Sequence, residues 1–222
     1  MDLGAEVTIR PYELRDRPAV RQIAFDTADN GEPASIFSDR QVFADILTRY
    51  YTDFEPQSLW VVDHAGQAVG YLSGCLDDRR YQRVMAWRVV PAALVRAIAR
   101  GALARRETWR LLGALVRTGR SGEFHQPAAL AHYPAHLHIN IRQGFRGQQI
   151  GPRLVGRFVE QARAAGVGGI HAGVHEDNQP ARRFFERLGF ASLGRYAVVL
   201  PDGETYRISG TIVYGKRVNA DG

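Results

Sequence analysis

The chain has 222 residues, 45% of them hydrophobic and 23% charged, which suits one globular domain with a sizeable core or two small ones. Glycine and proline are scattered without a period, which excludes collagen-like and solenoid folds. No apolar run approaches the ~20 residues of a membrane-spanning helix, and the first ten residues lack the pattern of a secretory signal. The single cysteine, Cys75, excludes an internal disulfide, so we expect a reducing, cytoplasmic compartment.

The net charge is +6, and Lys216 is the only lysine among 29 basic residues. Residues 79–120 hold 11 arginines and one acid, Glu107, which leaves the remainder of the chain acidic. Such a stretch could contact nucleic acid, a lipid surface, a substrate or a protein partner. Because no aromatic interleaving or nucleic-acid motif accompanies it, we expect helices that pack over the domain by their apolar stripes, with solvated arginines.

The first half of the chain predicts a strand at 6–11, a helix starting at Asp16–Pro18, and a second helix capped by Ser38 or Asp39 that ends near Tyr50. Two strand-like runs, 58–63 and 67–74, are separated by a short glycine-containing loop and predict a hairpin.

The basic stretch predicts two amphipathic helices. The first helix would start near Pro91, which suits a first turn, and would end at Gly101. The second helix would span 105–116. We interpret residues 77–130 as a helical insertion.

The second half alternates strands and helices. Alternation at 135–141 predicts a strand, followed by a helix from Ile150, a strand at 169–174, a helix around 181–188 and a closing hairpin at 196–200 and 206–214. This order predicts an α/β fold: one domain over 1–222, with a central mixed twisted sheet and helices on both faces.

A candidate anion site lies between the strand ending at Ile141 and the helix from Ile150. A glycine-containing turn there leads into a helix, whose first backbone N–H groups are unpaired and face the positive end of the helix dipole. By itself such a turn is often structural. No Gly-Lys-Ser/Thr follows, and the spacing is not that of a dinucleotide fold.

Two motifs indicate a function for this turn. The segment 146–151, Arg-Gly-Gln-Gln-Ile-Gly, resembles the Q/R-x-x-G-x-G/A pyrophosphate loop of the GCN5-related N-acetyltransferases, the GNAT superfamily. The segment 178–190 is similar to the N-x-x-A-x-x-F-Y-x-x-x-G-F segment of that family. Tyr133 to Asn140 also looks like a bacterial subgroup similar to the acetyltransferase-like domain of O-GlcNAcase.

The resemblance implies acetyl-CoA as co-substrate, bound in a cleft where two strands splay apart. Backbone groups of Ile139, Asn140 and Ile141 would pair with pantetheine. The pyrophosphate would lie on the loop, and the implied cofactor contacts are Arg146, Gly147, Gln148, Gln149, Ile150, Gly151, Pro152, Asn178 and Phe185.

The sequence departs from the family pattern at four positions. Gln149 replaces a glycine, although a helical φ would tolerate it. Pro152 removes one N–H donor. Phe185 replaces the tyrosine that often protonates the thiolate, and Asn140 replaces the subgroup's aspartate and cannot act as a base.

Five of the seven histidines fall in the segment that would form the cleft: His132, His136, His138, His171 and His175. An imidazole with a reference pKa of about 6.5 suits a base near neutral pH, so we take His138 first and His136 second as the base, with Glu176 as a further candidate. Tyr133 could replace the absent acid through its hydroxyl, and Asn140 is a candidate site residue that cannot itself accept the proton. The alternative to a catalytic role is that these histidines are half-buried sheet residues, hydrogen-bonded to their neighbours. A metal site of His132, His136 and His138 lacks a cysteine or carboxylate, and we predict no metal.

These observations predict an acetyl-CoA-dependent N-acyltransferase that acts on a primary amine of a small molecule or protein by direct attack in a ternary complex. The amine, with a pKa near ~10.4, must lose a proton first. A catalytically silent module that binds CoA or a partner protein is the alternative, and an adaptor for anionic surfaces is a third. The arginines hint at an anionic group on the acceptor. The chain would be a monomer or a homodimer, with neither a nucleic acid partner nor a membrane span.

Overall fold

The computed structural model describes residues 6–28, 39–122 and 126–218, and the predicted cap Ser38 lies outside these ranges. The strands are β1 (Val7–Pro11), β2 (Leu59–His64), β3 (Gln67–Cys75), β4 (Ala135–Ile141), β5 (Gly169–His175), β6 (Ala191–Asp202) and β7 (Thr205–Arg217). The helices are α1 (Arg17–Asp26), α2 (Arg40–Asp53), α3 (Asp78–Val84), α4 (Val90–Ala99), α5 (Arg106–Ser121), α6 (Ile150–Ala164) and α7 (Gln179–Arg187).

The short helical segments are η1 (Leu14–Asp16), η2 (Pro56–Ser58), the π-helix η3 (Met85–Val89), η4 (Ala102–Ala104), η5 (Ala128–His132) and η6 (Gln143–Phe145). The element order confirms the predicted alternation of strands and helices around a helical insertion.

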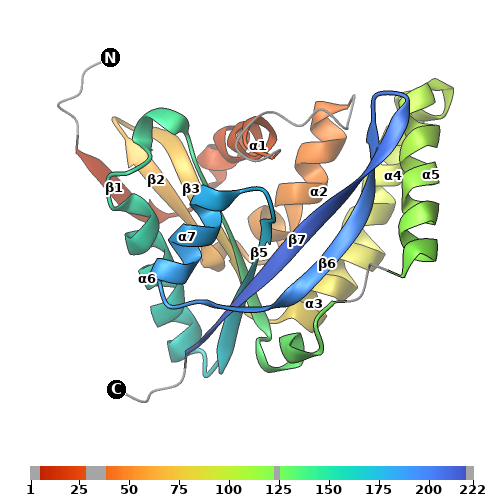
Figure 1. Ribbon diagram of the computed structural model, residues 1–222. Coiled ribbons are helices and arrows are strands. Elements are labelled where there is room, and N and C mark those ends of the chain that lie inside the picture. Colours follow the sequence, from red (N-terminus) through yellow and green to blue (C-terminus); the bar gives the residue numbers. More distant parts are fainter. Residues whose placement is uncertain (1–5, 29–38, 123–125, 219–222) are drawn as a thin grey trace.

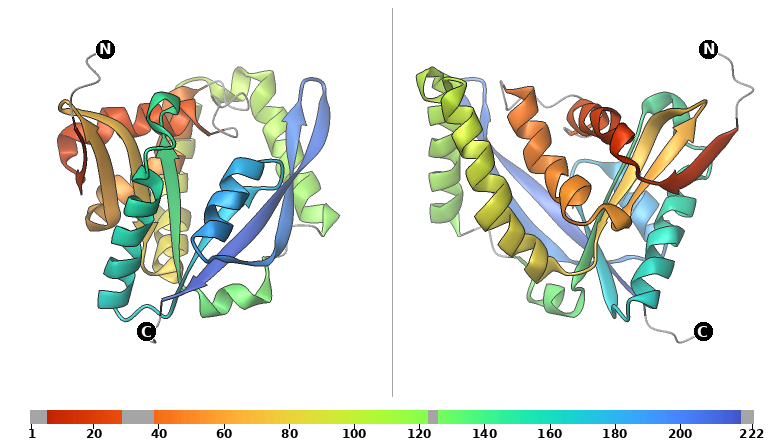
Figure 2. Two further views of the ribbon diagram at one scale, coloured as in Figure 1. Left: turned by 60° about the vertical axis from the view of Figure 1, so that its left-hand side comes forward. Right: turned by 180° about the vertical axis from the view of Figure 1, so that it is seen from behind.

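The seven strands form one mixed sheet in the order β1-β2-β3-β4-β5-β7-β6. Every neighbouring pair is antiparallel except β4 and β5, which are parallel. Helices cover both faces: α6 and α7 lie on one, and α1, α2 and the insertion lie on the other (Figures 1 and 2). The predicted α/β fold with a mixed sheet is therefore confirmed.

Local signals place most boundaries close to their predicted positions. Asp39 caps α2, because its side chain accepts hydrogen bonds from the backbone N–H groups of Gln41 and Val42. That helix runs to Asp53, beyond the predicted end near Tyr50. β6 and β7 also extend past the predicted hairpin, because pairing with each other satisfies the backbone groups over the whole length of both strands.

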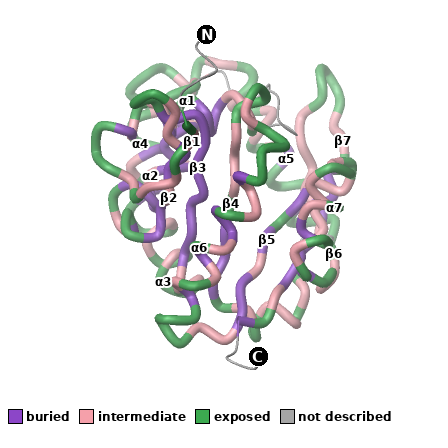
Figure 3. The backbone as a smooth tube through the Cα atoms, turned by 90° about the vertical axis from the view of Figure 1, so that its left-hand side faces the viewer, coloured by how far each residue is buried: buried purple, intermediate pink, exposed green. Residues whose placement is uncertain are grey.

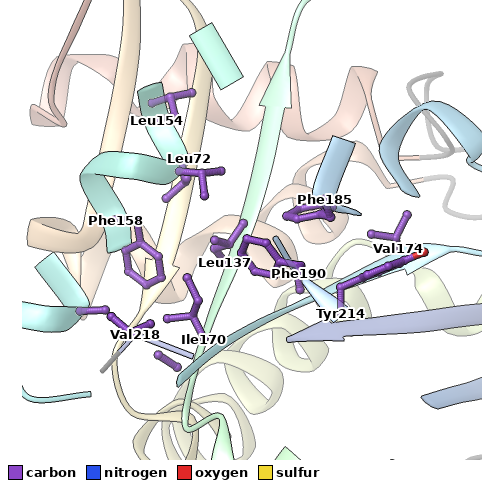
Figure 4. Close-up of a cluster of buried hydrophobic side chains, with 14 of the residues drawn as sticks. Leu72, Leu137, Leu154, Phe158, Ile170, Val174, Phe185, Phe190, Tyr214 and Val218 are labelled. Carbon is purple, nitrogen blue, oxygen red and sulfur yellow. The ribbon is translucent and has the colours of Figure 1, made fainter. Parts of the chain in front are cut away.

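Two apolar clusters lie on opposite faces of the sheet. The cluster under α6 and α7 includes Leu137, Phe158 and Phe185 (Figure 4), and the cluster under α1 and α2 includes Tyr50 and Tyr71. Buried residues run along the central strands in Figure 3.

The helical insertion starts at α3, earlier than the predicted helix at Pro91. α3, the π-helix and α4 follow one another without a break to Ala99, and Gly101 ends the run with a φ of 77°. Along the described residues, no helix combines the length and the apolar character needed to cross a membrane.

The insertion is oriented opposite to our expectation. On α4, Leu94, Val95 and Ile98 are exposed, and on α5 the stripe of Trp109, Leu112, Leu115 and Val116 is exposed as well. Two arginines reach α2 instead: Arg96 of α4 pairs with Asp45, and Nε of Arg100, which follows α4, lies 2.8 Å from the cap Asp39. The prediction that apolar stripes hold these helices against the domain is therefore wrong, because ion pairs to α2 fix the orientation of α4.

Candidate functional site: a diverging strand pair, an anion loop and an imidazole cluster

The strands β4 and β5 touch over only a short stretch. Their parallel register covers Ala135–Ile170 and His136–His171. Beyond these pairs β4 continues to Ile141 beside β3 alone, and β5 continues to His175 beside β7 alone. Among the described residues, the edge of β4 from Leu137 to Ile141 that faces β5 therefore has no strand partner. The backbone groups on this edge can bind an extended ligand, apart from the Ile141 carbonyl, which accepts from Arg146.

The loop that follows β4 presents a row of backbone donors. The N–H groups of Gly147, Gln148, Gln149, Ile150 and Gly151 have no acceptor within the described part of the chain. The last two open α6, so the positive end of its dipole adds to the same site. This arrangement fits a phosphate group, whose oxygens accept several N–H hydrogen bonds at once. Pro152 offers no donor, as expected from its chemistry.

The loop conformation corrects one expectation. Gln149 does not take a right-handed helical φ: its φ is +58°, in the left-handed region that glycine prefers. Gly147, with a φ of +81°, also lies there. Gly151 is needed for packing instead, because a Cβ at its position would lie 2.8 Å from the ring of Phe184 on α7.

Other predicted coenzyme contacts have structural partners. Arg146 Nε donates to the carbonyl of Ile141 (2.9 Å), which ties the loop to the end of β4. Asn178 caps α7 by accepting from the N–H of Ala181 (3.1 Å). Phe185 lies in the core, only 4% exposed, and stacks with Tyr214. Its position does not support the predicted contact with the coenzyme.

His136 is held from both sides. Its Nδ1 lies 2.6 Å from Asp78, and its Nε2 lies 2.7 Å from the hydroxyl of Tyr51. Burial raises the pKa of Asp78, but the hydrogen bond and charge of His136 outweigh this effect and bring the pKa below 3.8. The ionised Asp78 carboxylate accepts the Nδ1 proton, and Nε2 shares a hydrogen bond with the Tyr51 hydroxyl. Both ring nitrogens are thus engaged, which leaves no lone pair for a substrate.

His138 has a different environment on the same face of β4. Its side chain is exposed and has no hydrogen-bond partner among the described residues, while its ring lies 5.6 Å from that of His136 and 6.0 Å from that of Tyr51. Desolvation by the surrounding atoms, followed by the charges of His136 and His171, lowers the pKa of His138 well below 6.5. His138 is therefore a neutral imidazole at pH 7 with a free lone pair.

His171 completes the cluster from β5. Its Nδ1 donates to the carbonyl of Tyr133 (2.8 Å), which leaves Nε2 unprotonated in the neutral ring. Its ring centroid is 5.6 Å from that of His136. Burial lowers the pKa of His171 as well, despite the opposing hydrogen bond to Tyr133.

The remaining predicted residues lie in other settings. Asn140 donates through Nδ2 to the hydroxyl of Tyr71 (2.8 Å). The ring of Tyr133 fills space that a Cβ at Gly169 or Gly215 would occupy, which makes Tyr133 a packing residue and not part of the imidazole cluster. His175 bonds Ser209 at 2.9 Å, His132 is exposed in η5, and the Glu176 carboxylate packs on Gly210.

The sequence reading missed Asp78 and Tyr51. Neither belongs to a recognisable motif, and each lies more than 50 residues from His136 along the chain. The sequence analysis predicted no helix at this position, and an acid at a helix start is typical of a cap, which the neighbouring Asp77 provides for α3. Only the pairing of distant elements brings Asp78 to His136.

The donor atoms of Cys75, Asp78 and His136 lie within 4.8 Å of one another, so we tested them as a metal site. His136 is already bonded to Asp78 and Tyr51, and Cys75 Sγ lies 3.6 Å from the hydroxyl of Tyr50. We describe the group as a hydrogen-bond network.

A hollow of about 580 Å³ on α3 and η3 is lined by Arg79, Gln82, Arg83, Ala86 and Trp87. It contains none of the predicted site residues. We therefore place the site at the imidazole cluster and the loop, where the chemical groups converge.

A family model described as "Acetyltransferase (GNAT) family" matches residues 113–190, which include β4, the loop and α7. The structure titled "Crystal structure of SsHAT" is 26% identical, has a TM-score of 0.70, and is matched over 96% of this chain and 99% of that one.

Two further structures show the same fold. A putative acetyltransferase, yncA from Salmonella typhimurium, solved with its cofactor acetyl-CoA, is 16% identical with a TM-score of 0.58, over 97% of this chain and 95% of that one. A ribosomal-protein-alanine N-acetyltransferase from Brucella melitensis is 18% identical with a TM-score of 0.55, over 95% and 99%. The chain is thus similar to the GNAT acetyltransferase family over residues 113–190, and it shares the fold of these acetyltransferase structures over nearly its whole length.

Proposed function

We propose that this chain transfers an acetyl group from acetyl-CoA to a primary amine. The observation that carries the proposal is the row of unpaired N–H groups from Gly147 to Gly151, next to the free edge of β4. The loop would hold the pyrophosphate, and the backbone of Ile139 to Ile141 would pair with the pantetheine amides. When bound, acetyl-CoA supplies the activated thioester that the amine attacks.

His138 is our candidate for the base. An amine with a pKa near ~10.4 is mostly protonated at pH 7 and cannot attack until it loses a proton. The exposed, unpartnered imidazole of His138 can take that proton directly or through one water. Its lowered pKa keeps it unprotonated at neutral pH, at the cost of some basicity.

His136 has a positioning role in this scheme. Asp78 and Tyr51 hold its ring, and its ring in turn packs edge-on against that of His138. Phe185 has no proton to donate and lies in the core, so we assign no general acid from this chain. A thiol pKa near ~8.5 allows the departing sulfur to leave without one.

Binding of acetyl-CoA is the first test. Calorimetric titration with acetyl-CoA, CoA and dephospho-CoA should show micromolar binding of the first two ligands. Arg146→Ala frees the carbonyl of Ile141 and loosens the loop, so we expect acetyl-CoA to bind about tenfold more weakly. Arg157→Ala, on an exposed turn of α6, is the matched control and should bind like the parent chain.

Catalysis is the second test. In a screen of primary amines, His138→Ala should lower kcat/KM at least about 100-fold with unchanged affinity for acetyl-CoA, because a general base contributes about that much. His132→Ala removes an exposed imidazole from η5 and should leave the rate unchanged.

Two results would contradict the proposal. Absence of heat at millimolar acetyl-CoA would show that the loop does not bind the coenzyme. Tight binding without turnover of any amine would instead favour the catalytically silent module that binds CoA.

A further inference from the structure

The helix α5 buries small side chains and exposes large apolar ones. Ala114 and Thr118 are buried, and Thr118 Oγ1 accepts a hydrogen bond from the N–H of Val199 on β6 (2.8 Å). Four large apolar side chains are instead between 43% and 59% exposed. They are Trp109, Leu112, Leu115 and Val116, and we call them the α5 stripe. An exposed apolar row of this kind is available for contact with another molecule.

The geometry of a helix makes the α5 stripe continuous. Trp109, Leu112 and Val116 follow one another at i, i+3 and i+7, so they lie on one side of the helix. With Leu115 included, the stripe covers roughly 120° of the helix circumference, at about 100° per residue. The stripe therefore belongs to one helix and needs no contribution from α4.

The arginines of α5 gather along one edge of the α5 stripe. They recur at i, i+4, i+11 and i+14, which places them within about 80° of one another, starting about 20° from Trp109. They are Arg106, Arg110, Arg117 and Arg120, and we call them the arginine flank. The one acid of α5, Glu107, lies about 140° from the centre of the stripe.

The arginine flank keeps its positive charge. Arg106 reaches Glu204 at 3.5 Å, but 80% and 81% of the two side chains are exposed, so this pair is weak. Arg117 lies over the ring of Tyr206, 4.1 Å from its centroid, which holds the guanidinium without neutralising it. Within the described ranges, the other two arginines of the flank form no ion pair with an acid.

The charge beside the α5 stripe selects the partner. An apolar stripe flanked by arginines is typical of a helix that lies in the surface of an anionic bilayer, where the guanidinium groups reach the lipid phosphates. A second copy of this chain would bring like charges together, and a nucleic acid would leave the α5 stripe in water. The 11 arginines and one acid of residues 79–120 add attraction to an anionic surface over a longer range.

We propose that α5 binds the surface of an anionic lipid bilayer. The α5 stripe would lie at the boundary between headgroups and acyl chains, and the arginine flank on the phosphates. α5 forms an outer edge of the molecule, on the side away from β1, where a bilayer can approach it (Figures 1 and 2). This inference does not depend on acetyl transfer.

Flotation of the full chain with vesicles tests the proposal. The chain should float with vesicles that contain phosphatidylglycerol and not with vesicles of phosphatidylcholine alone, and added salt should weaken the binding. Leu115→Asp places a charge in the α5 stripe and should weaken binding at least about tenfold. Leu14→Asp is the matched control: Leu14 is 72% exposed in η1, beside β1, and its variant should bind like the parent chain.

A second pair of variants tests the arginine flank. An arginine at an anionic surface contributes about fivefold to binding, so the Arg106→Gln, Arg120→Gln double variant should bind phosphatidylglycerol vesicles about 25-fold more weakly. The Arg157→Gln, Arg187→Gln double variant removes two exposed charges from α6 and α7, on the other face of the sheet. It has the same net charge and should bind like the parent chain.

Four outcomes would overturn the proposal. They are no flotation with phosphatidylglycerol vesicles, equal flotation with phosphatidylcholine vesicles, unchanged binding of the Leu115→Asp chain, and an equal loss in the Leu14→Asp chain. Circular dichroism shows whether each variant is folded, and Leu112→Asp repeats the test at a second position of the stripe. Absence of flotation together with RNA binding that Leu115→Asp leaves unchanged would identify a nucleic acid as the partner instead.

Discussion

Gln149 carries the clearest backbone strain among the loop residues. Its φ of +58° costs a residue with a Cβ about 1–2 kcal/mol relative to glycine. Gln149→Gly removes that cost, although the added freedom of the unfolded chain offsets about 0.5–1 kcal/mol of it. We expect a net stabilisation of about 0.5–1 kcal/mol, seen as a Tm higher by about 1–4 °C.

The neighbouring Gln148 provides the control, because its φ is not positive. Gln148→Gly should therefore lower Tm slightly or leave it unchanged. Equal effects of the two substitutions would show that the left-handed φ of Gln149 is not the source of the gain.

Asp78 supports a buried imidazole and should matter for stability. Asp78→Ala leaves the Nδ1–H of His136 without an acceptor, which costs about 1–3 kcal/mol for a buried group. Asp78→Asn keeps an acceptor oxygen and should cost less. Urea unfolding measures both, and equal losses would mean that the hydrogen bond to His136 contributes little.

At the scale of elements, the contact between α6 and β3 depends on a missing side chain. A Cβ at Gly74 would lie 2.1 Å from the ring of Phe158, which is fully buried. Gly74→Ala should therefore destabilise the chain by about 1–3 kcal/mol through overpacking. Gly156→Ala, in the middle of α6 with no atom near the added Cβ, should instead stabilise it by about 0.5–1 kcal/mol.

Thermal unfolding of both glycine variants checks the sign of each effect. A Gly74→Ala chain as stable as the parent would mean that α6 shifts freely over the sheet. That result would also question how firmly the start of α6 positions the loop.

The sequence was most informative where a signal is local. Alternation of His136, Leu137 and His138 predicts β4, and Asp39 predicts the start of α2, because a strand period and a cap depend on neighbouring residues only. The positive φ of Gln149 was not predictable from composition, since glutamine has no preference for that region. The motif position, usually glycine in the family, was the one available signal.

The orientation of the insertion depended on distant partners. An apolar stripe on a helix predicts an inward face, and on α4 and α5 that rule failed. The ion pairs from Arg96 and Arg100 reach residues more than 50 positions earlier in the chain, which a periodic pattern cannot reveal. For the same reason, the sequence alone did not predict that Asp78 and Tyr51 contact His136.

For the whole molecule, the imidazoles set a pH dependence. Desolvation by the surrounding protein lowers the pKa of His138 and of His171 in the folded chain below 6.5, the value expected after unfolding. Below pH 6.5 the unfolded chain therefore binds more protons, and the free energy of unfolding decreases as the pH falls. The low pKa of Asp78 adds a further loss only below pH 3.8.

Urea unfolding at pH 7, 6 and 5 tests this dependence. The parent chain should lose stability steadily over this range, and a His138→Gln, His171→Gln double variant should lose less. Identical slopes for the two chains would assign the pH dependence to other groups.

Because β4 and β5 pair over only a short stretch, a small rotation at this contact moves the far ends of the two strands by a larger distance. Within the described ranges, the strand pairs Ala135–Ile170 and His136–His171 are the only ones that join the two halves of the sheet, and they lie at one end of both strands. The five residues from there to Ile141 span about 16 Å at about 3.3 Å per residue, so a rotation of about 5° at the joint moves the far end by about 1.4 Å. Substitutions at Ala135 or Ile170 would thus change the separation of the strands at the loop, which neither residue touches.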